Sequence, residues 1–387
     1  MTTVNFSHNL QSGSPTLNGT AGSLIGVLDA ALVSGFGLQT ATITVASGVA
    51  TLTTPLAHPF EVAQIVLVAG ADNTALNGRK RVLTRTTTGI TFAAAGVADG
   101  AATGSINVKV APAGWAKEFS GTNKAVYRAP ASADGCRLYL RVDDTFGCNA
   151  RVVGYESMTD VDTGERPFPT STQLSGGGWW PKSNAADSTA RAWTVIADDR
   201  GFYLHMGTGN AAGDSGSVWG FGDFASYKSG DAYASMLAST NSDQSANWSA
   251  DGFALEYVSN SYYLRCARSF TGIAGAISLR KSPESFGSGD GNSGAGTGFL
   301  NIYPNRSNNG LILSRIVLSE EGVCLRGNQR GAYVTPQNCH ASFTRNTVID
   351  GAGDMAGRRK SARSPLPAGL VSGVGGGACR GGELGHG

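Results

Sequence analysis

Short runs of alternating apolar and polar residues, separated by turns that contain glycine, recur through most of this 387-residue chain. The clearest pair is residues 42–46 (TITVA) and 49–53 (VATLT), which flank Ser47-Gly48 and predict a β-hairpin. Successive side chains of a strand point to opposite faces, so such runs suit a sheet with one buried face. Because the chain holds 55 glycines, which favour turns and are costly inside helices, the pattern predicts an all-β protein.

One early segment departs from this period. Apolar residues recur at helical spacing between residues 20 and 34, namely Leu24, Val27, Leu28 and Leu32. We expect a single short helix within an N-terminal arm of residues 1–37, packed on the domain that follows; docking on a neighbouring subunit is the alternative. The arm shows no charged segment followed by an apolar run, so no secretory signal is expected.

The strand pattern divides the rest of the chain into two domains. Six or seven short runs with regular turns in residues 38–112 predict a small Ig-like β-sandwich. Longer runs rich in aromatic residues predict a larger β-sandwich or jelly-roll-like domain over residues 113–325. Residues 326–355 are expected to form a C-terminal extension, and the basic, then glycine-rich residues 356–387 a disordered tail.

Charge and cysteine usage exclude several classes of partner. The net charge is only +2, which gives no electrostatic reason to expect nucleic acid or an anionic membrane as a partner. The six cysteines contain no CxxC pair, so a zinc site is not expected and buried free thiols are favoured. We expect no cofactor.

Motifs that resemble catalytic or metal sites have simpler explanations. Gly213-Asp-Ser-Gly216 matches the nucleophile motif of chymotrypsin-like proteases, but the N-terminal histidine considered as its partner, His58, lies in the other predicted domain. Asp143-Asp144 and Asp198-Asp199 offer calcium ligands, although acids beside turns more often cap backbone amides. The sequence therefore predicts a protein that is not an enzyme.

Two adjacent tryptophans are the candidate contact residues. Trp179 and Trp180 follow three glycines, and exposed aromatic rings of this kind stack on sugars in carbohydrate sites. A role in the core or in an interface is the favoured interpretation, and a glycan-stacking platform is the alternative.

The stretch from Val108 to Thr170 resembles a known family. Its segments Phe119–Arg128, Tyr139–Asp144 and Ala150–Asp160 look like those of virion structural proteins from tailed bacteriophages and Mu-like prophages. The segment from His58 to Gly78 resembles a small sandwich module of phage tail and baseplate proteins, and the whole resemblance covers roughly residues 40 to 355.

This resemblance implies a structural role in an assembled particle and transfers no active site. The expected function is a tail or tail-tip protein, with a capsid decoration protein and a carbohydrate-binding host-recognition module as alternatives. The expected partners are other copies of the chain, as a trimer or hexamer, and other virion proteins. The expected location is the virion, assembled in the bacterial cytoplasm.

The C-terminus departs from the family pattern. Residues 350–358 look like a family segment that is normally followed by one more core strand, whereas basic and glycine-rich sequence follows here. We hypothesise a reading-frame shift in the gene after Arg358. Translation of the neighbouring frames tests this, and the absence of an alternating apolar strand in both would contradict it.

Overall fold

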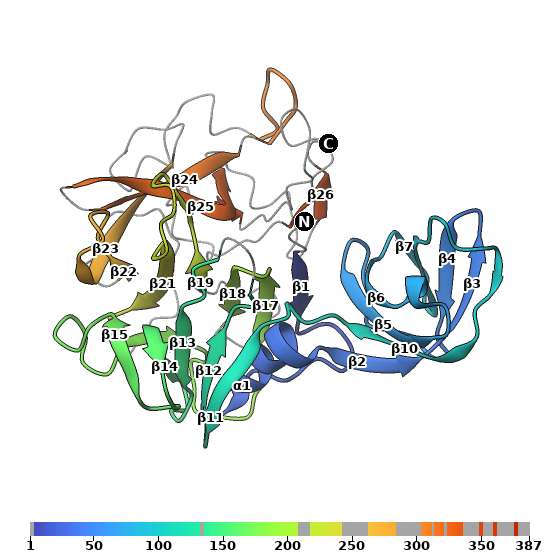
Figure 1. The fold of residues 1–387 in the computed structure, drawn as a ribbon, viewed down its shortest axis with the longest axis horizontal. Helices are drawn as coiled ribbons and strands as arrows, with labels where there is room; N and C mark the ends of the chain where they lie inside the picture. Colours follow the sequence, from blue (N-terminus) through green and yellow to red (C-terminus); the bar gives the residue numbers. More distant parts are fainter. Residues whose placement is uncertain are drawn as a thin grey trace.

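The computed structural model describes residues 4–131, 135–207, 217–241, 262–283, 303–311, 313–320, 323–335, 348–350, 359–361 and 375–377. Over these residues the chain is all-β with one short helical segment near its N-terminus, as the alternation predicts. Two β units are visible, a small one and a larger one (Figure 1). In the part of the chain that the structure describes, no helix has the length and apolar character needed to cross a membrane.

The small unit is a sandwich of two antiparallel sheets. One sheet contains β2 (Phe36–Thr40), β10 (Gly104–Val110), β5 (Ile65–Ala71) and β6 (Gly78–Arg81). The other contains β7 (Thr84–Arg85), β8 (Gly89–Ala93), β4 (Val49–Thr53), β3 (Thr42–Ala46) and β9 (Gly100–Ala101), and the 3-10 turn Thr74–Leu76 follows β5. The apolar positions of the alternating runs meet between the sheets, including Ile43, Leu52, Val66, Phe92 and Val108.

The hairpin predicted around Ser47-Gly48 is confirmed. β3 and β4 pair in register from Thr42↔Thr53 to Ala46↔Val49. Ser47 and Gly48 both have positive φ, 50° and 75°, as the mirror-image turns that suit twisted hairpins require. Turn chemistry and alternation together fix this part of the fold.

The larger unit is a succession of antiparallel strands, most of which pair with their neighbours in sequence. A first group comprises β11 (Ala116–Gly121), β12 (Lys124–Arg128), β13 (Tyr139–Asp143), β14 (Asn149–Met158) and β15 (Gly164–Phe168), with β16 (Gly178–Pro181) also on β14. A second comprises β17 (Ala192–Ala197), β18 (Gly201–Gly207), β19 (Ser217–Asp223), β21 (Ser235–Thr240), β22 (Tyr262–Arg268), β23 (Ala274–Pro283), β24 (Ser314–Glu320) and β25 (Cys324–Thr335). The two groups are joined where Trp179 of β16 pairs with Thr240 of β21.

Short strands complete the larger unit. β20 (Ala225–Ser226) pairs with β25, whose ladder with β24 continues to Val334, beyond the predicted domain end at residue 325. Further on, β26 (Val348–Asp350) pairs with β27 (Arg359–Ser361), and β28 (Gly375–Gly377) pairs with β25. Apart from β27 and β28, the predicted tail of residues 356–387 lies outside the described residues.

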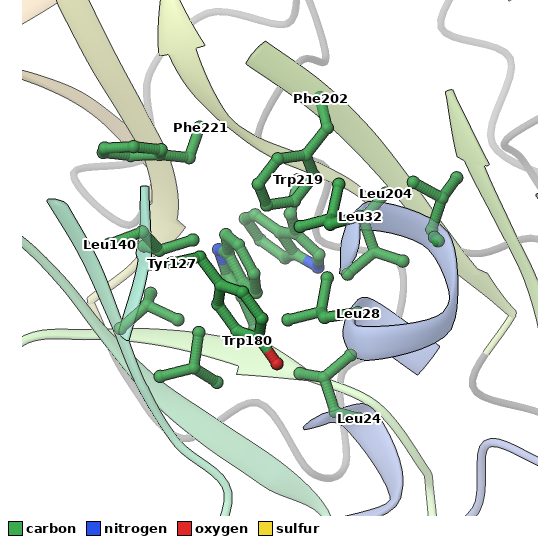
Figure 2. Close-up of a cluster of buried hydrophobic side chains, with 14 of the residues drawn as sticks. Leu24, Leu28, Leu32, Tyr127, Leu140, Trp180, Phe202, Leu204, Trp219 and Phe221 are labelled. Carbon is green, nitrogen blue, oxygen red and sulfur yellow. The ribbon is translucent and has the colours of Figure 1, made fainter. Parts of the chain in front are cut away.

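The N-terminal segment belongs to the larger unit rather than to the sandwich that follows it in sequence. β1 (Asn5–His8) pairs antiparallel with β17, from Asn5↔Ala197 to His8↔Thr194. The helical segment consists of α1 (Ser23–Leu28) and a π-helical turn, Asp29–Ser34. Its four predicted apolar residues have no exposed surface and pack with Tyr127, Leu140 and Trp180 (Figure 2).

The small sandwich is thus an insertion between the helix and β11. Its first and last strands are neighbours, with Phe36 opposite Val110. Immediately outside the insertion, the Gly114 amide donates to the Leu32 carbonyl at 2.9 Å. The chain therefore leaves and re-enters the larger unit at adjacent points.

We expect residues 36–112 to fold when expressed alone, because both sheets and all of their buried core except Ala30 lie within this range. A fragment of residues 113–335 should fail to do so, because it lacks β1, which pairs with β17, and the helix, whose apolar side chains form part of its core. Circular dichroism melts and dispersed amide NMR spectra measure both outcomes. A cooperative transition for the second fragment alone would contradict this domain organisation.

Candidate functional site

The two candidate tryptophans lie on opposite faces of one strand. β16 pairs with β14 so that Trp179 is opposite Arg151 and Trp180 opposite Ala150. Trp180 has no exposed surface; its indole N–H donates to the Ala238 carbonyl at 2.6 Å, and its ring meets that of Phe202 edge to face (Figure 2). Trp180 offers no surface to a glycan, so only Trp179 remains as a candidate contact.

Trp179 is half-buried in a small aromatic and cationic cluster at the surface. The Arg151 guanidinium lies 3.4 Å from the centroid of the indole ring, and the rings of Phe146 and Trp179 meet edge to face with their centroids 5.3 Å apart. Arg151 is held over the ring by hydrogen bonds to the carbonyls of Ser175 (3.1 Å) and Gly177 (2.6 Å). Phe146 is 47% exposed. We define Phe146, Arg151 and Trp179 as the surface cluster.

The surface cluster offers apolar and cationic contacts but contains no reactive group. The guanidinium covers one face of the indole, a favourable cation–π contact that also removes this face as a stacking surface. What it presents to solvent is the Phe146 ring beside a fixed positive charge. Sequence reasoning missed Phe146 and Arg151, because the β14–β16 register that brings Arg151 to Trp179 has no local signature.

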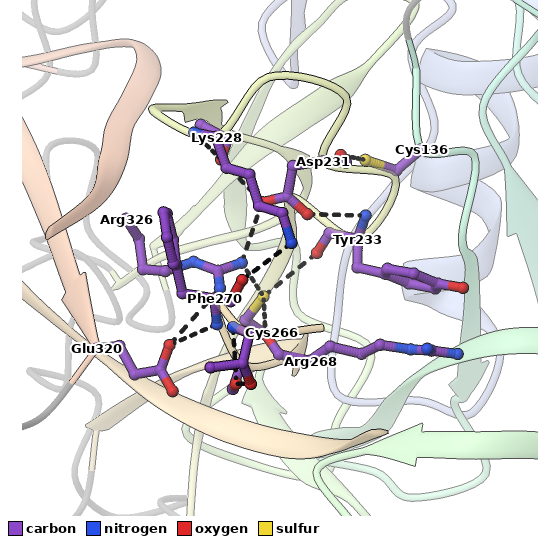
Figure 3. Close-up of polar contacts among 12 residues, drawn as sticks. Cys136, Lys228, Asp231, Tyr233, Cys266, Arg268, Phe270, Glu320 and Arg326 are labelled. Atoms are coloured by element: carbon purple, nitrogen blue, oxygen red, sulfur yellow. Dashed lines mark hydrogen bonds and ion pairs between the residues drawn. The ribbon is translucent and has the colours of Figure 1, made fainter. Parts of the chain in front are cut away.

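A second cluster of polar side chains lies inside the larger unit (Figure 3). Arg326, with no exposed surface, contacts Asp231 at 3.2 Å and Glu320 at 3.6 Å, and both carboxylates are nearly buried. The rings of Phe224 and Phe270 lie 5.6 Å from the guanidinium carbon. The Arg326 guanidinium, beside two carboxylates and two rings, offsets part of the buried negative charge and joins β25 to β24 and to the segment before β21.

The thiols near this cluster are not nucleophiles. Burial raises the pKa of Cys266 to about 11, and burial together with the adjacent Asp223 raises the pKa of Cys136 further still. Since only the thiolate attacks, both groups are inert at neutral pH. Cys136, Cys148, Cys266 and Cys324 are free thiols, and Cys339 and Cys379 lie outside the described residues.

The motifs weighed for catalysis do not assemble a site within the described residues. Ser215 and its tetrapeptide lie outside them. His58 is buried in the small sandwich, stacked on Phe60, with Nε2 3.1 Å from the Gly89 carbonyl oxygen, and burial lowers its pKa. Nowhere in the described ranges do three potential metal-ligating side chains gather.

One aspartate of each pair accepts hydrogen bonds from two backbone amides. Asp198 Oδ1 accepts from the amides of Arg200 and Gly201, at 2.9 and 3.0 Å, in the turn between β17 and β18. Asp144 Oδ2 accepts from the amides of Leu24 and Ile25 at the start of α1. Asp198 and Asp144 therefore accept from backbone amides, as expected of acids beside turns.

No family model and no curated protein matches this chain.

Proposed function

We propose that this chain is a non-enzymatic structural protein of a tailed-phage virion, located at the tail or tail tip. The observation that carries the proposal is the insertion of a complete β-sandwich at two adjacent points of a larger β unit. Such a sandwich presents sheet edges and loops to neighbouring subunits without disturbing the core that supports it. The resemblance of residues 108–170 to virion structural proteins supports the same assignment.

Buried polar contacts between the two units also support an assembly role. Gln64 Nε2 donates to the Phe6 carbonyl at 2.7 Å, and Gln11 Nε2 donates to Gln64 Oε1 at 3.0 Å. His8 Nε2 lies 3.0 Å from the Glu61 carboxylate. These contacts fix the sandwich relative to the N-terminal strand. A fixed orientation suits a subunit repeated about a particle axis, and we propose a homo-oligomer, a trimer or hexamer.

Particle purification tests the proposal. Phage particles from an induced lysate of the source bacterium are banded on a density gradient, and the band is analysed by peptide mass spectrometry. Peptides of this chain should follow the particle band after a high-salt wash, at a fixed ratio to the major structural proteins. Recovery only in the soluble fraction would contradict the proposal.

The alternative within the same class is a capsid decoration protein. Gene position separates the two locations, because tail genes adjoin the tape-measure gene and head genes adjoin the major capsid gene. Separation of heads from tails before mass spectrometry gives an independent answer, with the chain expected in the tail fraction.

The second candidate function is binding of a host-surface glycan, favoured by the exposed ring of Phe146 beside Trp179. If it holds, Trp179→Ala should reduce binding on a glycan array about fivefold or more, since stacking contacts of this kind contribute about 1 kcal/mol or more. Tyr227→Ala, a change at another exposed aromatic residue, serves as the control and should leave binding unchanged. Equal binding by wild type and Trp179→Ala would remove the cluster from consideration.

A further inference from the structure

A lysine and an aspartate face each other in the interior of the larger unit. Lys182 follows β16 and Asp144 follows β13, and neither side chain has any exposed surface. The Lys182 Nζ contacts Asp144 Oδ1 directly. Burying two full charges in this way costs several kcal/mol unless other contacts compensate, so this pair requires an explanation beyond surface ion pairing.

The second carboxylate oxygen is held by backbone donors. The Leu24 amide donates to Asp144 Oδ2 at 2.8 Å and the Ile25 amide at 3.3 Å. The two oxygens of one carboxyl group are therefore in different roles. Oδ2 is polarised by two fixed N–H groups, as the carbonyl oxygen is in an acyl-transfer site, while Oδ1 lies against the amine.

The surroundings also favour the uncharged pair. The Lys182 Nζ donates to the Thr20 carbonyl at 2.6 Å, which orients the nitrogen beside the carboxyl group. Burial raises the pKa of Asp144 to about 6, against the opposing effects of Lys182 and of the Leu24 and Ile25 amides, and burial lowers the pKa of Lys182 against the opposing effect of Asp144. Both shifts favour a neutral amine beside a carboxylic acid, which are the reactants of amide formation.

We propose that Lys182 and Asp144 condense into an intramolecular amide between Nζ and Cγ. The ammonium first transfers a proton to Oδ1, which gives an amine and a carboxylic acid. The nitrogen lone pair attacks Cγ, the negative charge develops on Oδ2 between the two backbone amides, and the Cγ–Oδ1 bond breaks. A second proton from the nitrogen leaves with Oδ1, so the products are the amide and one water, and nothing is oxidised or reduced.

The position of the link gives it a structural role. It joins the ends of β13 and β16, which lie on either side of β14, and its carbonyl oxygen keeps both backbone donors at the start of α1. A covalent bond there closes the chain between residues 144 and 182 and reduces the entropy of the unfolded state, as a disulfide does. The bond is proposed independently of the role in a virion.

Mass spectrometry of the denatured full-length protein tests the proposal. The wild type should be lighter than its sequence mass by one water. After trypsin digestion, the peptide of residues 142–151 should be found joined to the peptide that begins at Val152, with no cleavage after Lys182. Lys182→Arg keeps the positive charge but supplies no amine, and should have the full sequence mass with both peptides separate.

An internal control comes from the partly exposed pair Lys124 and Asp162, 2.9 Å apart, which should remain unlinked and cleavable after Lys124. A mass deficit of one water that maps to an Asp-Gly sequence would indicate a succinimide instead of the proposed bond, and would overturn the assignment. A wild-type protein of full mass, with residues 142–151 released as a free peptide and cleavage after Lys182, would overturn it as well.

Discussion

Replacing Arg326 with methionine is expected to lower the free energy of unfolding by about 3–5 kcal/mol, the usual cost of removing one partner of a buried ion pair. The guanidinium has no exposed surface and is the ion-pair partner of Asp231 and of Glu320, whose side chains are only 6% and 8% exposed (Figure 3). In the variant these two carboxylates stay buried without a counter-charge. Urea unfolding followed by tryptophan fluorescence measures the loss.

Arg166→Met is the matched control. The Arg166 side chain is 52% exposed and lies 3.7 Å from Glu156, so its removal should change the free energy by no more than about 1 kcal/mol. Similar effects of the two substitutions would mean that the Arg326 cluster is open to water, and the account of it as a closed internal network would be wrong.

Trp180→Ala is expected to cost about 3–5 kcal/mol, the usual penalty for removing a large aromatic ring from a packed core. The ring contacts Phe202, and the helical segment covers the same core through Leu28 and Leu32 (Figure 2). The cavity should therefore loosen both the helix and the sheets. Hydrogen exchange at the amides of α1 should rise together with the loss in unfolding free energy.

The neighbouring substitution provides the control for this prediction. Trp179→Ala removes a half-buried ring and its stacking with Arg151, a loss of about 0.5–1 kcal/mol. The two variants differ by one position in the sequence but should differ severalfold in destabilisation. Equal losses would contradict the assignment of the two side chains to opposite faces of β16.

The two tryptophans also show what the sequence could have revealed. Treating Trp179-Trp180 as one platform required both rings on the same face, which a strand does not allow, because successive side chains alternate. The alternation used to predict the strands was sufficient to separate the pair. The local sequence does not indicate which face of the strand is buried, so the tertiary structure was needed to show that Trp180 is the buried ring.

Local features of the fold were predictable where turn chemistry and alternation agree. The Ser47-Gly48 hairpin is one case, and the turn at Asp198–Gly201 between β17 and β18 is another, with the Asp198 amide donating to the Gly201 carbonyl at 3.0 Å. In both cases the strands that pair are consecutive, so the information needed lies within about a dozen residues.

Long-range features were not predictable in this way. β1 reaches its partner strand across almost two hundred residues, from Asn5 to Ala197, and no local pattern specifies that pairing. The same holds for buried charges. Lysine and arginine are usually surface residues, and Lys182 and Arg326 are internal because they pair with Asp144 and Asp231, which are distant in sequence. The insertion of the small sandwich follows from the β1 pairing and was missed for the same reason.

Immunogold electron microscopy of purified virions, with antibody raised against residues 115–325, tests the proposed particle role most directly. The account predicts label at one defined site, the tail or tail tip, on most particles. Label on the head would keep the structural role but move the protein to the capsid. Virions without label, from lysates in which the protein is present and free, would contradict the account.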